Sequence, residues 1–245
     1  MEQFFKKIEG FQILIVGIFF SLCMIVSTSI FSKTLSRSGI EVTGSAVAIV
    51  KSDSATWTLT VTTASASKKA AFDNLVKDKN TVLNYLKLKG FSDTEIEVQN
   101  ANPYPIFKKA PNTGEETSVV DHYEISQTIL VNSTNISLVK DISLDAENLL
   151  SKGIDVRSDP PAYFYTKLAD LKVQLLNQAS EDAKKRAKAM LRNTGSHLGG
   201  IKSIKTGVFQ ITPPNSTEVS DYGMYDTSTI DKKVTAVTQV IFKIK

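Results

Sequence analysis

Residues 163–204, YFYTKLADLKVQLLNQASEDAKKRAKAMLRNTGSHLGGIKSI, decide the fold. Apolar residues recur within them at steps of three and four, the period of a helix with one apolar stripe. The stripe comprises Leu168, Leu171, Leu175, Ala179, Ala183, Ala187 and Met190. It narrows from leucine to alanine toward its middle, so we expect another stretch of backbone to approach the helix closely there. Gly195 follows the helix, and Gly199 and Gly200 lead into an apolar run that predicts a strand.

The same helix carries a run of four basic residues, Lys184, Lys185, Arg186 and Lys188. Such a run could face phosphate groups, but Glu181 and Asp182 lie within one helical turn of it, so we interpret it as a solvated helix face. The formal net charge of the whole chain is only +4, with both signs interspersed. We therefore predict no nucleic-acid partner.

Residues 11–31, FQILIVGIFFSLCMIVSTSIF, contain no charged side chain and follow Lys6 and Lys7. A helix of this length reaches about 30 Å, enough to cross the hydrocarbon core of a bilayer. We expect one N-terminal transmembrane helix, with residues 1–38 as anchor and linker and residues 39–245 as one exported domain. The predicted location is the inner (cytoplasmic) membrane, single-pass, with the C-terminal domain in the periplasm or outside. The alternative is a cleaved signal peptide, although the run exceeds the roughly 7 to 15 residues of a usual signal core.

The rest of the chain alternates strands and helices. Residues 55–62 place Ala55, Trp57, Leu59 and Val61 on one face and threonines on the other, which predicts a strand with Trp57 in the core. Helices are predicted over residues 67–89, with Phe72 facing inward, and over residues 135–152. Further strands are predicted over residues 119–131, 201–211 and 234–244, and a loop over residues 213–233. The fold class that follows is α+β, with a mostly antiparallel sheet packed against about three helices.

Residues 101–118 predict a long hairpin arm or loop, because Pro103 and Pro105 belong at a sheet edge or a bulge. Exposed aromatic and apolar residues on this arm and in the later loop form the candidate interaction surface: Tyr104, Ile106, Phe107, Tyr222 and Tyr225. The alternative for the arm residues is an ordinary hairpin tip with no partner.

Residues with catalytic or metal-binding chemistry are few. The single cysteine, Cys23, falls in the apolar N-terminal run, and the only histidines are His122 and His197. Neither histidine lies near a nucleophile motif; we expect His122 on a polar strand surface and His197 beside a helix end. Asp53 is interpreted as a turn residue that makes local hydrogen bonds. We therefore assign no catalytic, cofactor-binding or metal-binding residue and expect no cofactor.

Four segments together resemble the SIMPL domain family, also called the DUF541 family. They are IEVTGSAVAIVKSDSATWTLTV at residues 40–61, KGFSDTEIEVQNANPYPIF at residues 89–107, LLSKGIDV at residues 149–156, and residues 168–204 of the stretch quoted above. The resemblance covers residues 39–245, with Ser52 standing where such sequences often have proline. It implies a bacterial periplasmic protein of the oxidative-stress-defence type: an exported or membrane-anchored α+β domain without established catalytic residues, some members of which form ring-like oligomers.

Two functional hypotheses follow. The first is a non-enzymatic, membrane-anchored cell-envelope protein that self-associates through exposed strands or loops and serves stress resistance. The alternative is an envelope binding module whose cleft holds a small molecule or peptide. Both hypotheses include the membrane as a partner through residues 11–31.

Overall fold

The structure is a computed structural model that describes residues 16–28 and 39–245. The chain divides into two compact units. We call the first the terminal unit, which takes its described residues from Met1–Ala46, Leu176–Gly207 and Ala236–Lys245. The second is the central unit, made of Val47–Leu175 and Val208–Thr235. Three elements contribute residues to both: β1 (Gly39–Lys51), α4 (Leu168–Leu191) and β10 (Asp231–Ile244).

The central unit contains an antiparallel sheet in the order β3-β4-β2-β5, with β6 also paired to β2. Its strands are β2 (Ser54–Ser65), β3 (Ile96–Lys109), β4 (Glu116–Ser133), β5 (Val156–Ser158) and β6 (Ala162–Phe164). The ladder between β2 and β4 runs in unbroken register from Ala55 opposite Ser133 to Ser65 opposite Tyr123. The predicted strand with alternating threonines is therefore β2, near the centre of this sheet.

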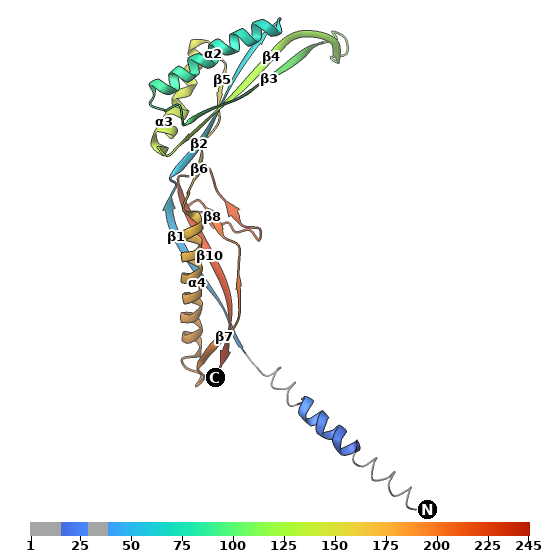
Figure 1. The fold of residues 1–245 in the computed structure, drawn as a ribbon, viewed down its shortest axis with the longest axis vertical. Helices are drawn as coiled ribbons and strands as arrows, with labels where there is room; N and C mark the ends of the chain where they lie inside the picture. Colours follow the sequence, from blue (N-terminus) through green and yellow to red (C-terminus); the bar gives the residue numbers. More distant parts are fainter. Residues whose placement is uncertain (1–15, 29–38) are drawn as a thin grey trace, which may run out of the picture. The chain divides into compact units, whose positions relative to one another are not determined.

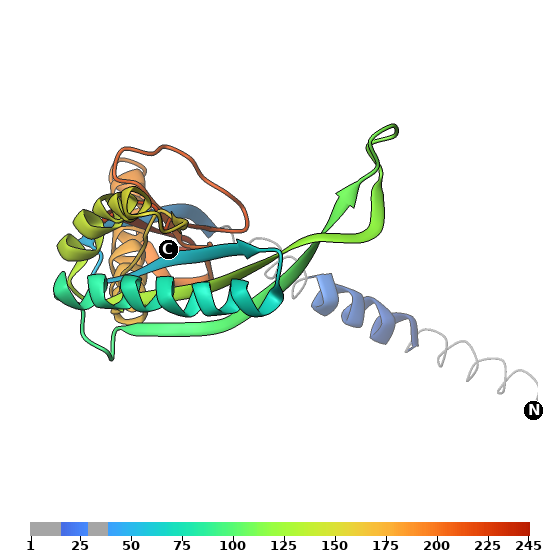
Figure 2. The ribbon, with the colours of Figure 1, turned by 90° about the horizontal axis from the view of Figure 1, so that it is seen from above.

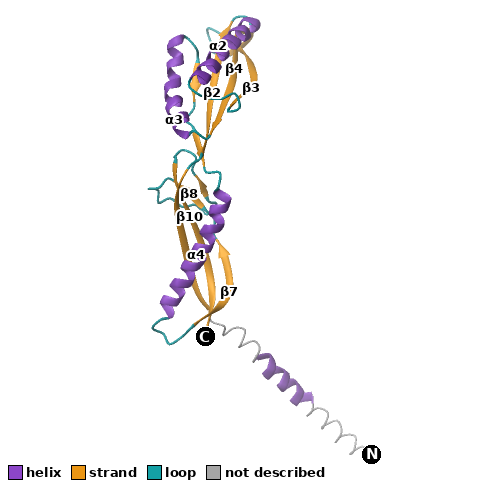
Figure 3. Ribbon diagram, turned by 60° about the vertical axis from the view of Figure 1, so that its left-hand side comes forward, coloured by secondary structure: helices purple, strands orange, loops and turns teal. Residues whose placement is uncertain are grey.

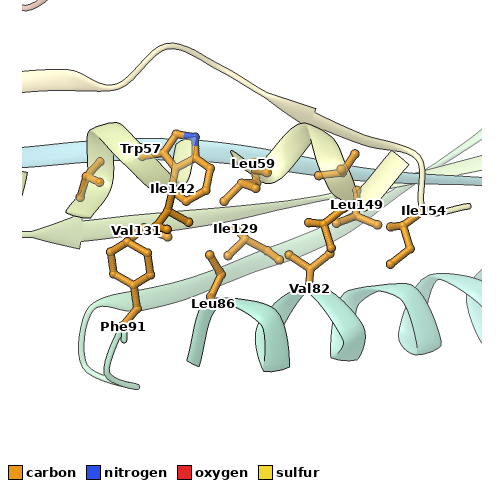
Figure 4. Close-up of a cluster of buried hydrophobic side chains, with 14 of the residues drawn as sticks. Trp57, Leu59, Val82, Leu86, Phe91, Ile129, Val131, Ile142, Leu149 and Ile154 are labelled. Atoms are coloured by element: carbon orange, nitrogen blue, oxygen red, sulfur yellow. The ribbon is translucent and has the colours of Figure 1, made fainter. Parts of the chain in front are cut away.

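One face of this sheet is covered by α2 (Lys68–Leu88), α3 (Ile136–Asp145) and the 3-10 helix η1 (Ala146–Lys152). The predicted helix over residues 135–152 is thus two helices in series. Trp57 is fully buried among apolar residues of β2, β4 and all three helices (Figure 4). Its indole Nε1 donates a hydrogen bond to Ser158 Oγ over 3.0 Å, which satisfies the one polar atom of the ring. The prediction that Trp57 is a core residue is confirmed.

Local signals place the helix ends in the central unit. Asn135 precedes α3, and its side chain accepts a hydrogen bond from the backbone N–H of Leu138 at 3.1 Å, as expected of a cap residue. Ser67 stands in the same position before α2 but makes no such bond. Gly90, one residue beyond the C-cap of α2, has a φ of 105°, which lets the chain turn away there.

The terminal unit packs α4 against β1 and β10, with β7 (Leu198–Thr206) pairing antiparallel to β10. Its core contains Val42, Ala183, Ala187, Val240 and Phe242. At the alanine stretch of α4 the backbone of β1 comes very close: a Cβ built on Gly44 would lie 2.1 Å from the carbonyl oxygen of Ala179 and 2.4 Å from the nitrogen of Ala183. The predicted close approach of a second backbone is confirmed, and Gly44 makes it possible.

Two details of the helix and strand predictions are wrong. The buried stripe of α4 ends on Leu191, whereas Met190 is exposed, because the helix turns the next residue toward the core. The predicted strand over residues 201–211 is two strands, β7 and β8 (Gln210–Thr212), separated at Gly207. The N–H of Gly207 donates to the carbonyl of Val237 at 2.9 Å.

The fold class is α+β with largely antiparallel pairing, as predicted. The one parallel pair among the described strands joins β8 to β9 (Met224–Tyr225), a two-residue strand inside the predicted loop. Residues 16–28 form a helix, while residues 11–15 and 29–31 of the predicted membrane span lie outside the described residues. Within the parts of the chain that the structure describes, no helix has both the length and the apolar character needed to span a bilayer.

Candidate functional site

The arm predicted from the prolines is a β-hairpin formed by β3 and β4. Figures 1 and 2 show that its distal part extends past the end of α2. Pro103 pairs with Ile125 and Pro105 with Tyr123, so both prolines lie within the ladder of an edge strand. The turn closes through a hydrogen bond from Ala110 N–H to the carbonyl of Glu115 at 2.8 Å. The arm is therefore paired up to its tip, with register shifts after Val98, Ile106 and Phe107.

Tyr104 and Ile106 share one face of the arm, because alternate residues of a strand point the same way. Tyr104 is 57% exposed and Ile106 36% exposed. Phe107 is half-buried and follows a register shift after Ile106, where it pairs with Val120. The arm thus presents two of its three candidate residues on a common exposed face.

A groove of about 510 Å³ lies at the base of the arm, where β3 and β4 meet the first turn of α2. Its lining residues are Lys68, Lys69, Phe72, Ala101, Pro103 and Ile125. None of the predicted interaction residues lines it. Phe72, predicted to face inward, is 49% exposed, because Ala71 and Leu75 are the residues that this part of α2 turns into the core. Helical periodicity alone could not decide which of the adjacent apolar residues Ala71 and Phe72 faces the core.

The other candidate residues, Tyr222 and Tyr225, line a separate cleft of about 420 Å³ in the central unit. Phe209 forms part of its wall, and the Lys172 ammonium lies 5.2 Å from the centre of the Phe209 ring, a cation–π distance. Tyr222 is 97% exposed. The tyrosine cleft shares no lining residue with the arm groove, so the five candidate residues do not form a single site.

The loop that carries these tyrosines is held by a buried lysine that sequence reasoning missed. Lys232 is 1% exposed, and its ammonium donates to the carbonyls of Asp226 at 2.6 Å and Thr229 at 2.8 Å. Burial lowers the pKa of Lys232, and the Asp226 carboxylate at 3.6 Å opposes that shift. Burial raises the pKa of Asp226, but hydrogen bonds from Thr229 and Ser228 and the charge of Lys232 outweigh it and bring this pKa to about 2. The group of polar residues has an evident structural role, which is to fix the loop.

The residues with potential catalytic chemistry make structural contacts. Asp53 accepts hydrogen bonds from the backbone N–H of Thr166 at 2.7 Å and from its hydroxyl at 2.8 Å, so its bonds join distant segments and the expected local bonding is wrong. His122 Nδ1 lies 2.9 Å from an Asp121 carboxylate oxygen. The backbone of His197 exchanges two hydrogen bonds with Lys245, each 2.8 Å long. Over residues 16–28 and 39–245, no three His, Cys, Asp or Glu side chains are grouped so as to hold a metal ion.

A third cleft, of about 750 Å³, lies in the terminal unit where α4 ends and β7 begins. Ala189, Leu191 and Leu198 supply apolar lining, and three basic side chains border the cleft: Lys188, Arg192 and His197. Earlier in α4, Asp182 accepts the backbone N–H of Ser45 at 2.9 Å and pairs with Arg186 at 2.8 Å. The hydrogen bond from Ser45, aided by the charges of Arg186 and Lys185, lowers the pKa of Asp182. This acidic side chain therefore bonds directly to β1 and to Arg186.

The chain matches a known family model. A family model described as "SIMPL: Protein of unknown function (DUF541)" matches residues 40–242, which is most of the chain. No curated protein matches the chain.

Proposed function

The chain belongs to the SIMPL (DUF541) family, and on that premise we propose that it is a non-enzymatic cell-envelope protein, anchored by residues 11–31, whose exported domain self-associates through the β3–β4 arm. The observation that carries the proposal is the exposed face of the arm with Tyr104 and Ile106. Aromatic and apolar side chains that extend beyond the core are typical of protein interfaces. The resemblance to oxidative-stress-defence proteins motivates stress resistance as the process served.

The edge of the arm favours association through side chains over strand addition. Pro103 and Pro105 have no backbone N–H, and prolines in an edge strand turn that missing donor toward the free side. A second strand would therefore find an incomplete row of donors along β3. The exposed face beside the prolines, with Tyr104 and Ile106, is the better contact surface.

The non-enzymatic part of the proposal is supported by the structural hydrogen bonds that the candidate polar residues make. Asp53 is bonded to Thr166, and Asp226 and Lys232 hold a loop. Substitution of Asp53, His122 or His197 should leave a phenotype of a deletion strain fully complemented. Loss of complementation with folded protein at normal abundance would argue for an enzyme.

Sedimentation of the full chain in detergent tests self-association. We expect a discrete oligomer for the natural sequence and a shift toward monomer for the double substitution Tyr104→Ser and Ile106→Ser. Val219→Ser is the control, because Val219 is an apolar residue 81% exposed in a loop distant from the arm in sequence. A strict monomer at high concentration, or an oligomer unchanged by the double substitution, would contradict the proposal.

Two measurements test the membrane part. Alkaline carbonate should leave the chain in the membrane pellet if residues 11–31 span the bilayer, and should release it if they do not. An alkaline phosphatase fusion after Ser38 should be active if the domain is exported. An inactive, stable fusion would place the domain on the cytoplasmic side.

The second candidate function is a binding module, favoured by the tyrosine cleft. Its wall combines Phe209 and Tyr225 with the cation of Lys172, which suits a small aromatic or anionic ligand. Chemical crosslinking separates the candidates, since self-association gives discrete oligomer bands and a monomeric binder gives none.

A further inference from the structure

The charges of this protein are divided between its two units. The described part of the terminal unit has nine basic residues against three acidic ones, a formal net charge of +6. The basic residues are Lys184, Lys185, Arg186, Lys188, Arg192, Lys202, Lys205, Lys243 and Lys245, and the acidic ones are Glu41, Glu181 and Asp182. The central unit has 16 basic residues against 20 acidic ones, a net charge of −4. The modest +4 of the whole chain conceals this division.

Two of the three acidic residues of the terminal unit have partners of their own. Asp182 is bonded to Ser45 and Arg186, and Glu41 accepts a hydrogen bond from the side chain of Gln239. Asp182, one of the two acidic residues that the sequence places beside the basic run, is thus bonded to β1 and to a single member of that run, Arg186. With nine basic residues against three acidic ones, the described part of this unit keeps an excess of positive charge that can attract an external anion.

Several cations gather at one end of the terminal unit. There α4 ends at Leu191, β7 begins at Leu198, β10 ends at Ile244 and β1 begins at Gly39 (Figures 1 and 3). The backbone bonds between His197 and Lys245 tie β7 to β10 at this end. We call this end, with its 750 Å³ cleft and the side chains of Lys188, Arg192, His197, Lys243 and Lys245, the basic end.

The basic end also exposes apolar side chains. Met190 is exposed on α4 and Ile201 on β7, and the cleft has an apolar lining from Leu191 and Leu198. Cations beside exposed apolar groups are characteristic of surfaces that lie at the headgroup level of a bilayer. A surface for a highly charged soluble anion would not need the apolar part.

Chain connectivity brings the same end close to the predicted membrane span. Gly39 is the first residue of β1 and packs on β10, where its Cβ would lie 3.0 Å from the carbonyl oxygen of Phe242. Only residues 32–38 separate it from the apolar run, and such a segment reaches about 25 Å at most. A tether this short keeps lipid headgroups at a high effective concentration around the basic end. A weak attraction between its cations and the headgroups is therefore enough to maintain contact.

We propose that the basic end binds the anionic surface of the membrane in which the chain is anchored, with a phospholipid phosphate beside Lys188, Arg192 and His197 in the cleft. The proposal rests on the proposed membrane anchor. The cations hold the phosphates, while Met190 and Ile201 contact the apolar boundary of the headgroups. The domain is thereby held against the bilayer.

The test uses the full chain in nanodiscs, with Cys23→Ser to remove the natural thiol and Asn193→Cys to attach an environment-sensitive fluorophore beside the cleft. We expect a more apolar fluorophore environment in discs containing phosphatidylglycerol than in purely zwitterionic discs, and reversal at about 0.5 M salt, where the Debye length falls to about 4 Å. The triple substitution Lys188→Gln, Arg192→Gln and Lys243→Gln should weaken the surface contact about 100-fold, or about fivefold for each charge.

A matched control removes the same charge from the central unit: Lys77→Gln, Lys140→Gln and Lys152→Gln should leave the contact unchanged. Equal signals in anionic and zwitterionic discs, or equal losses in the two triple variants, would overturn the proposal. One further result would overturn the proposal: the first triple substitution dissociates an oligomer but leaves the response to anionic lipid intact. The basic end would then bind the acidic central unit of a second copy instead of the membrane. Release of the chain by carbonate refutes the anchor separately, and vesicles titrated against the released, labelled chain then test lipid binding itself.

Discussion

Replacing Gly44 by alanine should destabilise the terminal unit more than the same replacement at any other described glycine of that unit. The new Cβ would lie 2.1 Å from the Ala179 carbonyl oxygen, 2.4 Å from the Ala183 nitrogen and 2.8 Å from the Ala183 Cβ. Two of these atoms belong to the backbone of α4, so no side-chain rotation relieves the overlap. To lengthen the distance between the new Cβ and the Ala179 carbonyl oxygen from 2.1 Å to the 3.4 Å of ordinary contact, β1 must move away from α4 by about 1.3 Å.

The size of this displacement determines how much stability Gly44→Ala removes. A radial gap of about 1 Å forfeits up to about half of the dispersion energy across the contact, and overpacking a core usually costs about 1 to 3 kcal/mol. Because the obstacle is backbone, we expect a loss near the upper limit, about 3 kcal/mol. For a chain of this size the melting temperature then falls by about 6 to 12 °C.

Thermal melting followed by circular dichroism measures the effect on the purified full chain. Gly200→Ala is the matched control, because nothing lies within 4 Å of its Cβ position and the same methyl group is added. A shift of less than about 2 °C between the two variants would refute the reasoning. The close approach of β1 to α4 would then not be a tight packing constraint.

Three further predictions concern the central unit. Lys232→Met should lower the free energy of unfolding by about 3 kcal/mol, because it leaves the Asp226 carboxylate without its ammonium partner. Urea unfolding followed by Trp57 emission measures this loss, with the exposed Lys109→Met as control. Equal urea midpoints for the two variants would contradict the prediction. The Asp226 pKa of about 2 lies below the unfolded value of about 3.9, so its contribution is present above pH 4 and lost as pH falls toward 2. Asp226→Asn should therefore lower the melting temperature at pH 7 and have a much smaller effect near pH 2, where about half of the folded-state carboxyl is protonated. A difference independent of pH would argue against the charge. Ser52→Pro should lower the melting temperature because it removes the N–H that donates to Ile230 at 2.8 Å, whereas Ser52→Ala should not, since the buried Ser52 hydroxyl has no partner among the described residues.

Features that depend on local periodicity were predictable from the sequence. Three patterns each predict one local geometry: the apolar stripe of α4, the alternation around Trp57 and the prolines of the arm. The helix and strands that they predict are all present. The narrowing of the stripe to alanine even predicted a close backbone partner, though nothing in the pattern identified Gly44 as that partner. The error at Met190 arose because the stripe can continue through either of two adjacent apolar residues near a helix end.

Features that depend on long-range pairing were not predictable. Lys232 follows a polar loop, and lysine is almost never fully buried, so no sequence signal marked it. Tyr104 and Tyr222 were grouped by residue type, yet Tyr104 lies on the arm and Tyr222 lines a cleft formed by other segments. The basic end is assembled from α4 and from β10, about 50 residues later in sequence, and charge counts along the chain cannot reveal such a surface.

The pairing of the first strand with the last has a consequence for how the protein is made. β1 emerges from the ribosome before any other strand, but its neighbour in the sheet is β10, the last strand synthesised. Until β10 arrives, β1 has an unpaired edge, and closing a loop of about 200 residues is slow. The central unit can meanwhile assemble most of its sheet from β2 to β6. Synthesis of this chain should therefore pass through an intermediate in which the central unit is largely folded and β1 is still unpaired, the stage at which a chaperone or protease would find it.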